Sequence, residues 1–145
     1  AKIVGANRSE VVVMNQLTVN LHLLMVSFYR PEGKPVKIIC EAKAFPSDQY
    51  MFETHIKALG YDPEEVLIEV SPRSGEVTIH QEDILAAIQQ TGEELALILW
   101  GGVNYYTGQL FDMATITRNE YVGLYGPTTE ENAQVFYTEF YNYGM

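Results

Sequence analysis

Two stretches decide the fold of this chain: Leu17-Thr18-Val19-Asn20-Leu21-His22-Leu23-Leu24 and Glu41-Ala42-Lys43-Ala44-Phe45-Pro46-Ser47-Asp48. Each has the pattern of a strand that ends in a short polar or aromatic turn, after which a helix begins. In an α/β sheet, turns of this kind lie beyond the carboxyl ends of the strands, where ligands bind. The two stretches therefore predict the fold class and the place of a binding site together.

Strand and helix patterns alternate around these turns. Short apolar or β-branched runs predict buried strands at 10–14, 36–40, 66–70 and 95–100. Apolar residues at helical spacing predict helices at 18–29, from 47 or 48 to 59, and at 81–90. The second helix is expected to be capped by Ser47 or Asp48 and to stop at Gly60. The alternation predicts an α/β fold, a mostly parallel sheet with flanking helices and right-handed crossovers.

The composition is that of a globular protein rather than a disordered one. The chain has 145 residues, 47% of them hydrophobic, and a mean hydropathy of −0.07. This length suits one domain, or a compact part of a larger one. No apolar run approaches the roughly 18–20 residues of a membrane span, and the N-terminus lacks the pattern of a secretory signal. The lone cysteine, Cys40, excludes an internal disulfide, favours the cytoplasm and is expected to be buried in its strand.

Charge and histidine spacing argue against two classes of function. Nineteen acidic and nine basic residues give a formal net charge of −10. The basic residues are scattered singly, whereas binding of nucleic-acid phosphates needs clustered Lys and Arg. His22, His55 and His80 lack the spacing of metal ligands, so no metal site is expected. Lys43 ends a strand beside a candidate site and is interpreted as a solvated or salt-bridged lysine.

Three turns qualify as ligand sites, and each has a purely structural alternative. Thr18 at the start of a helix could help to hold a phosphate, because helix N-termini present unpaired N–H groups, or it could be an ordinary N-cap. Phe45 could stack on a flat heterocycle, with polar contacts from the residues after it, or it could be a core residue. The loop 101–109 is rich in glycine but lacks the Gly-x-Gly-x-x-Gly pattern of nucleotide loops, so a plain loop stays open.

Residues 3 to about 118 resemble a continuous stretch of the kynureninases, hydrolases that depend on pyridoxal 5'-phosphate and have the type I fold of the aminotransferase superfamily. Besides the two stretches quoted above, the strings that carry the resemblance are Ile3-Val4-Gly5-Ala6-Asn7, Met14-Asn15, Gly75-Glu76, Glu82-Asp83-Ile84-Leu85, Gly102-Val103 and Tyr106-Thr107-Gly108-Gln109. The resemblance implies a partial cofactor-binding large domain at 1–118. The remaining residues, 119–145, are a tyrosine-rich acidic tail that does not match.

The resemblance also assigns cofactor contacts to the same turns. The implied contacts are Leu17, Thr18, Phe45, Pro46, Ser47, Asp48 and Gly101. The first two would bind the cofactor phosphate, Phe45 would stack on the pyridine ring, and the three residues after it would complete that wall. Members of the family often carry a cofactor-contacting serine where this chain has Gly101, so that side-chain contact is expected to be absent here.

The family cleaves kynurenine or 3-hydroxykynurenine to alanine and anthranilate or 3-hydroxyanthranilate in tryptophan catabolism, with the cofactor as electron sink. The resemblance implies a cytoplasmic homodimer. In the family, the cofactor-binding lysine and an Asp-x-x-His motif follow the matched region. This chain has no Asp-x-x-His and no lysine after Lys57, so it is expected to be inactive alone. The alternative is a non-catalytic α/β binding or oligomerisation domain, in which residues 119–145 cover strand edges or an oligomer contact.

Overall fold

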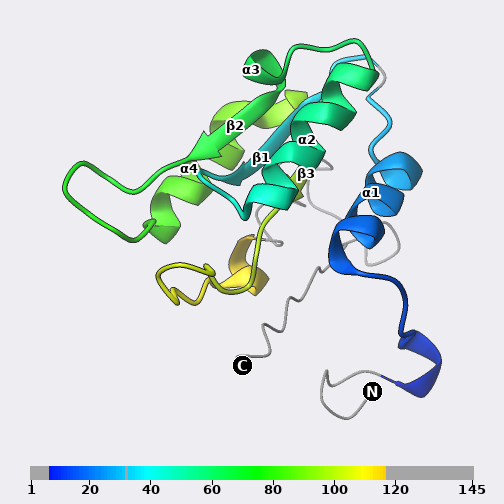
Figure 1. Cartoon of the computed structure of the whole chain (residues 1–145). Helices are drawn as coiled ribbons and strands as arrows, with labels where there is room; N and C mark the ends of the chain where they lie inside the picture. The colour runs from blue at the N-terminus through cyan, green and yellow to red at the C-terminus, as the bar shows by residue number, and fades with distance from the viewer. Residues whose placement is uncertain (1–6, 32, 117–145) are drawn as a thin grey trace.

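The described part of the chain folds around a parallel sheet (Figure 1). The computed structural model describes residues 7–31 and 33–116. The strands are β1 (Lys37–Glu41), β2 (Leu67–Val70) and β3 (Leu95–Leu99), and their order in the sheet is β2-β1-β3. The predicted α/β class with a parallel sheet is confirmed. The predictions for 119–145, and the resemblance at 3–6, lie outside the described residues.

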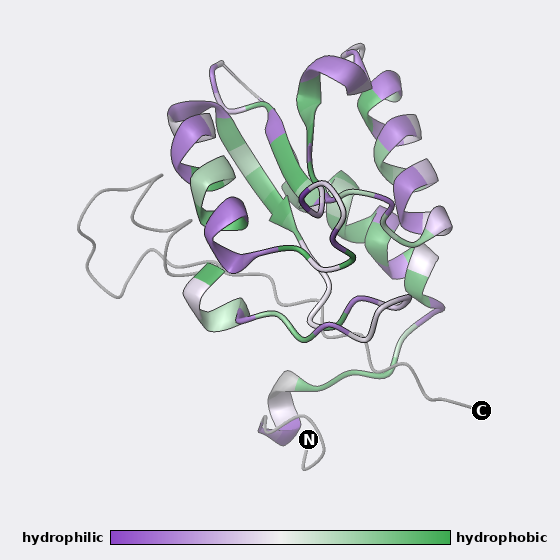
Figure 2. Cartoon of the chain, turned by 90° about the vertical axis from the view of Figure 1, so that its left-hand side faces the viewer, coloured by the Kyte–Doolittle hydropathy of each residue, from purple (hydrophilic) through white to green (hydrophobic). Residues whose placement is uncertain are grey.

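Helices cover both faces of the sheet. They are α1 (Leu17–Phe28), α2 (Pro46–Ala58), α3 (Pro63–Val66) and α4 (Gln81–Thr91), with the 3-10 turns η1 (Arg8–Glu10) and η2 (Gly92–Glu94). Successive side chains of β1 point to opposite faces, so Ile38 and Cys40 pack with α1 and α2 whereas Ile39 packs with α4. All three side chains are buried. Figure 2 shows the hydrophobic strands between helices that carry many hydrophilic residues, the arrangement expected of a parallel sheet.

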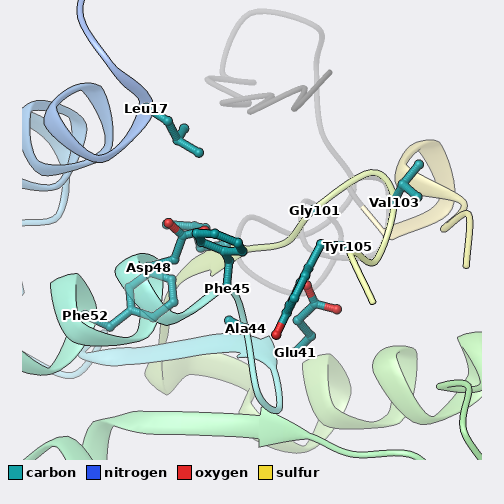
Figure 3. Close-up of a pocket in the computed structure, with 10 residues that line it drawn as sticks. Leu17, Glu41, Ala44, Phe45, Asp48, Phe52, Gly101, Val103 and Tyr105 are labelled. Atoms are coloured by element: carbon teal, nitrogen blue, oxygen red, sulfur yellow. The ribbon is translucent and has the colours of Figure 1, made fainter. Parts of the chain in front are cut away.

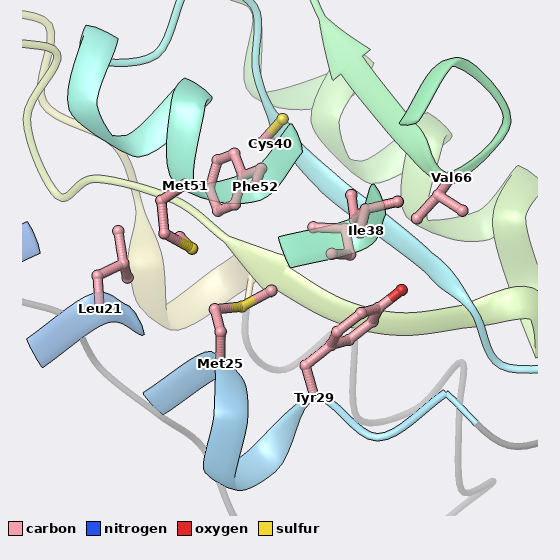
Figure 4. Packing of buried hydrophobic residues seen from close by; sticks show 9 residues of the cluster. Leu21, Met25, Tyr29, Ile38, Cys40, Met51, Phe52 and Val66 are labelled. Atoms are coloured by element: carbon pink, nitrogen blue, oxygen red, sulfur yellow. The ribbon is translucent and has the colours of Figure 1, made fainter. Parts of the chain in front are cut away.

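One apolar cluster joins α1 and α2 to the sheet (Figure 4). Leu21 and Met25 of α1 and Phe52 of α2 are almost fully buried in it. Burial of a side chain of this size stabilises the fold by about 1.5–3 kcal/mol. The hydroxyl of Tyr29, just after α1, donates to the Val36 carbonyl oxygen at 2.7 Å, and burial raises the pKa of this phenol to about 12. This packing fixes α1, and with it the start of the helix, relative to the sheet.

Residues 10–14 are not a strand, so that prediction is wrong. The turn η1 ends at Glu10, and Val12, Val13 and Met14 are exposed, Val13 to 94%. A β-branched run favours a strand only where a neighbouring strand supplies hydrogen bonds and a surface to pack against. Within the described ranges the sheet pairs β1, β2 and β3 and gives this run no such neighbour. The sheet therefore has three strands there, not the four expected.

The other predicted elements are present, and some of their ends are shifted. Both α1 and α4 match the predicted bounds to within one residue. The helix α2 begins at Pro46, and its N-cap is Phe45 without a side-chain capping bond, so the predicted cap by Ser47 or Asp48 is wrong. Proline suits a first helical position, because its φ is already near about −65° and it has no N–H to satisfy. The predicted stop at Gly60 is confirmed, with φ at +87°.

Candidate functional site

The three predicted turns meet beyond the carboxyl ends of β1 and β3, where they line one pocket (Figure 3). Its lining residues are Leu17, Glu41, Ala44, Phe45, Asp48, Phe52, Leu99, Gly101, Val103 and Tyr105. Four predicted cofactor contacts are among them, namely Leu17, Phe45, Asp48 and Gly101. Each of the three turns that the sequence singled out therefore contributes to the pocket wall.

The other three predicted contacts lie beside the pocket and are not among its lining residues. Thr18 is the second residue of α1 and is half-buried. Pro46 opens α2 and is exposed. Ser47 is half-buried, and its hydroxyl donates to Asp48 Oδ1 at 3.1 Å. Each of the three therefore adjoins a lining residue in sequence, in the first turn of a helix.

The N-terminus of α1 opens at this pocket. Leu17 is the first residue of the helix, and the N-cap is Gln16, so the alternative in which Thr18 is the N-cap is wrong. Gln16 makes no side-chain capping bond, and the first turn carries no acidic side chain. The amide of Asn20 donates to the Gln16 carbonyl at 3.1 Å, so the N–H groups at 17–19 precede the helical ladder. Such an end suits an anion, because its N–H groups and the helix dipole both favour negative charge.

Phe45 lies in the pocket wall and is 48% exposed, so the alternative of a core phenylalanine is wrong. Tyr105 packs edge-on against it, with ring centroids 5.1 Å apart and ring planes at 82°. The edge-to-face arrangement is one that aromatic rings prefer. The pair presents an aromatic surface to the pocket, which suits the stacking of a flat heterocycle.

Two buried carboxyl groups face the same pocket. Glu41 is 7% exposed and Asp48 is 8% exposed. Burial raises the pKa of the Asp48 carboxyl, and the hydrogen bond from Ser47 opposes this rise. Burial also raises the pKa of Glu41, while a hydrogen bond from Asn104 lowers it and the charge of Asp48 raises it. Sequence reasoning missed Glu41, although its place at the end of a predicted buried strand was a usable signal.

Gly101 is the second residue after Leu99, the last residue of β3, and it leaves room beside Glu41. A β-carbon there would lie 3.7 Å from Glu41 Oε1 and 3.4 Å from the Val103 carbonyl oxygen, which are ordinary contacts. The chain then turns back through an antiparallel bridge between Val103 and Leu110. The glycine-rich loop thus contributes Gly101, Val103 and Tyr105 to the pocket, and Tyr105 is a lining residue that sequence reasoning missed.

The remaining chemical groups near the turns do not join the pocket. Lys43 is exposed, is not a lining residue and has φ at +57°, which is uncommon for a residue other than glycine. Residues 7–31 and 33–116 contain no group of three or more His, Cys, Asp or Glu side chains that could hold a metal ion. Of the helices that the structure describes, none is long and apolar enough to cross a membrane.

The fold and the pocket define a class: a segment of an α/β protein with a parallel sheet and a ligand pocket at the carboxyl ends of its strands, consistent with part of a fold type I domain. No family model matches the chain. Among curated proteins it is similar to the kynureninases of Flavobacterium johnsoniae, 65% identical over 117 residues, and Christiangramia forsetii, 64% identical over 118. Each match covers 81% of this chain and 28% of the relative.

The human kynureninase is 51% identical to the chain over 116 residues, which are 80% of this chain and 25% of the human protein. The matched part of the chain is therefore a kynureninase-like segment. The chain spans only 25–28% of the length of these relatives.

Proposed function

We propose that the pocket is part of the pyridoxal 5'-phosphate site of a kynureninase, and that the whole protein hydrolyses kynurenine or 3-hydroxykynurenine. The observation that carries this proposal is the meeting of Leu17, Phe45, Asp48 and Gly101 around one pocket. They come from three separate turns, and the family resemblance assigns cofactor contacts to all four. The 50–65% identity to proteins named kynureninase supports this cofactor over other flat phosphorylated ligands.

The residues present fit a phosphorylated heterocycle. The N-terminus of α1 offers N–H groups without a nearby acidic side chain in its first turn, as a phosphate requires. Phe45 offers a half-exposed aromatic ring in the same pocket. Burial raises the pKa of the Glu41 and Asp48 carboxyl groups in the same pocket.

When bound, pyridoxal 5'-phosphate supplies an electron sink for cleavage of a carbon–carbon bond. The residues of this chain bind the cofactor and orient its ring. Leu17 and Thr18 hold the phosphate at the start of α1, Phe45 fixes the plane of the ring, and residues 46–48 exclude water from one side. We further propose that the whole protein acts in tryptophan catabolism as a cytoplasmic homodimer, as the family resemblance implies.

Titration with pyridoxine 5'-phosphate tests the binding site. This compound keeps the ring and phosphate of the cofactor but has no aldehyde, so it does not react with surface lysines. Trp100 is the single tryptophan of the chain, is buried, and precedes Gly101, so its fluorescence reports on the pocket. We expect a saturable change that Phe45→Ala abolishes. Tyr50→Ala removes an exposed aromatic side chain of α2 outside the pocket wall and is expected to bind normally.

Two controls make the titration decisive. N-acetyltryptophanamide at the same ligand concentrations corrects for light that the ligand absorbs. Pyridoxine without the phosphate measures the phosphate contribution, and we expect it to bind more weakly because it does not engage the start of α1. No saturable change in the wild-type chain, or equal binding by Phe45→Ala, contradicts the proposal.

A further inference from the structure

The side chain of Asn104 ties the glycine-rich loop to the buried end of β1. Its Nδ2 donates to Glu41 Oε2 at 2.8 Å. Its Oδ1 accepts from the backbone N–H of Tyr106 at 3.0 Å, from the backbone N–H of Thr107 at 2.8 Å and from the Thr107 hydroxyl at 3.0 Å. These contacts fix the orientation of the amide, because the reversed amide would set its NH₂ against two N–H donors and its oxygen against a carboxylate.

The same loop is closed on itself and attached at its far end. The amide of Asn104 donates to the Gln109 carbonyl oxygen at 2.8 Å, and the amide of Gly108 donates to the Asn104 carbonyl oxygen at 2.9 Å. The Gln109 side chain accepts from the Ile79 amide at 2.9 Å and donates to the Ile79 carbonyl oxygen at 2.6 Å. The loop thus has a side-chain attachment at each end, and the attachment to Glu41 is the one at the pocket.

Tyr105 links the hydrogen bonds of the Asn104 side chain to the pocket, which it lines. It directly follows Asn104 and precedes Tyr106, so the contacts of the Asn104 side chain bracket it in sequence. Its ring packs against Phe45, and Figure 3 shows Tyr105 and Phe45 side by side with Glu41 next to Tyr105. An edge-to-face contact depends on the placement of both rings, so a shift of the loop also changes the restraint on Phe45.

We propose that the hydrogen bond between Asn104 and Glu41 positions Tyr105 against Phe45, and that Tyr105 forms a second aromatic wall that orients Phe45 for stacking on a flat phosphorylated heterocycle. The stacking part rests on the proposed function, whereas the positioning part does not. Asn104 and Glu41 are positioning residues, because they act through the two rings. None of these roles is among the contacts that the family resemblance implies.

Exchanging the amide of Asn104 and the carboxylate of Glu41 distinguishes the effect of this hydrogen bond from general damage to the loop. Asn104→Asp sets a second carboxylate against Glu41 while it keeps an acceptor for the N–H groups of the turn. Adding Glu41→Gln restores the pair in the reversed direction, because the new amide donates to the new carboxylate. In Asn104→Asp we expect loss of the nuclear Overhauser contact between the Phe45 and Tyr105 rings, because the two carboxylates repel each other and the loop moves away from Glu41. We expect this ring contact to return in the double variant.

Ligand affinity gives the second readout. Affinity for pyridoxine 5'-phosphate is expected to fall about tenfold in Asn104→Asp and in Tyr105→Leu, and to recover in the double variant. Tyr50→Leu is the matched control. An unchanged ring contact in Asn104→Asp, or no recovery in the double variant, overturns the positioning. If affinity does not fall in the variant that loses the Phe45–Tyr105 ring contact, the proposed role of Tyr105 as a second aromatic wall is wrong. If the wild-type chain does not bind the ligand, the proposed function and the second wall both fail, while the ring contact still decides the positioning.

Discussion

Gly101 is a pocket residue at which the family resemblance predicts a missing side-chain contact with the cofactor. A β-carbon added there makes only ordinary contacts with Val103 and Glu41, so the site accommodates the β-carbon of a serine. We expect Gly101→Ser to strengthen binding of pyridoxine 5'-phosphate about 2- to 10-fold, the effect of one additional hydrogen bond. The Trp100 titration measures this change. Gly102→Ser, where an added β-carbon meets open space, is the matched control, and an equal gain in that variant contradicts the prediction.

Cys40 is buried, as predicted. We expect its thiol to make the folded state less stable at alkaline pH. Burial, and then the charges of Glu69 and Glu41, raise the pKa of its thiol from 9.0 to about 12. The folded state thus holds this proton more tightly than the unfolded state, so the stabilisation is complete below about pH 9 and is lost as the pH rises toward 12. Between pH 8 and pH 10.5 we expect the free energy of unfolding to fall about 1–2 kcal/mol further in the wild type than in Cys40→Ala.

Urea titrations at the two pH values measure this difference. The comparison is between the pH-dependent decreases in the free energy of unfolding of the two proteins, so the constant cost of the space that alanine leaves cancels. The contribution of Tyr29, whose pKa is likewise raised to about 12, cancels as well because both proteins contain this residue. An equal fall in both proteins would mean that the thiol is not held in its protonated form.

Among the elements, the end of α2 depends on one glycine. Gly60 has φ at +87°, its amide donates to the Lys57 carbonyl oxygen at 3.0 Å, and the amide of Tyr61 donates to the Ile56 carbonyl oxygen at 3.2 Å. These are the paired bonds of a Schellman motif. We expect Gly60→Ala to lower the free energy of unfolding by about 1–2 kcal/mol, because a β-carbon is strained in this conformation even in open space.

Urea unfolding tests this prediction, with Gly102→Ala as the matched control. Gly102 also faces open space but is not among the glycines with positive φ. An equal loss of stability in both variants would assign the effect to the removal of glycine in general and not to the left-handed cap.

The elements that the sequence predicted correctly have local signals. The helices α1 and α4 follow from apolar spacing, and the stop of α2 follows from the backbone freedom of Gly60. The run 10–14 failed because a strand also needs a partner, and pairing is a property of the whole sheet. The short helix α3 was missed although Asp62-Pro63 carried a local signal: the Asp62 carboxylate accepts from the Glu64 amide at 3.0 Å, as an N-cap does.

For the whole molecule, the sequence predicted the place of the site and only part of its lining. A parallel sheet brings the carboxyl ends of its strands to one edge, so the meeting of three turns follows from the fold class. Tyr105 was missed because the direction of its side chain depends on a tertiary contact, here the one with Phe45. The cofactor roles assigned to the seven residues stay predictions until the titrations are made.

The chain by itself is expected to bind the cofactor without catalysing cleavage. It has no Asp-x-x-His motif, and Lys43, the lysine nearest in sequence to the pocket residues, is exposed and is not in the pocket wall. After pyridoxal 5'-phosphate and borohydride, we expect intact mass and peptide mapping to find reduced adducts spread sparsely over the lysines. With kynurenine present, we expect no anthranilate fluorescence.

Lys43→Arg is the matched control for both measurements, because it keeps the positive charge but does not form a reducible adduct with an aldehyde. A stoichiometric adduct at one lysine that disappears in Lys43→Arg would contradict the prediction and make Lys43 a cofactor-binding residue. Its φ of +57° would then be the feature to explain, because such a backbone conformation is uncommon outside glycine and often occurs at functional sites. Sparse adducts that are unchanged in Lys43→Arg would instead agree with a site that binds phosphate and ring without a lysine of its own.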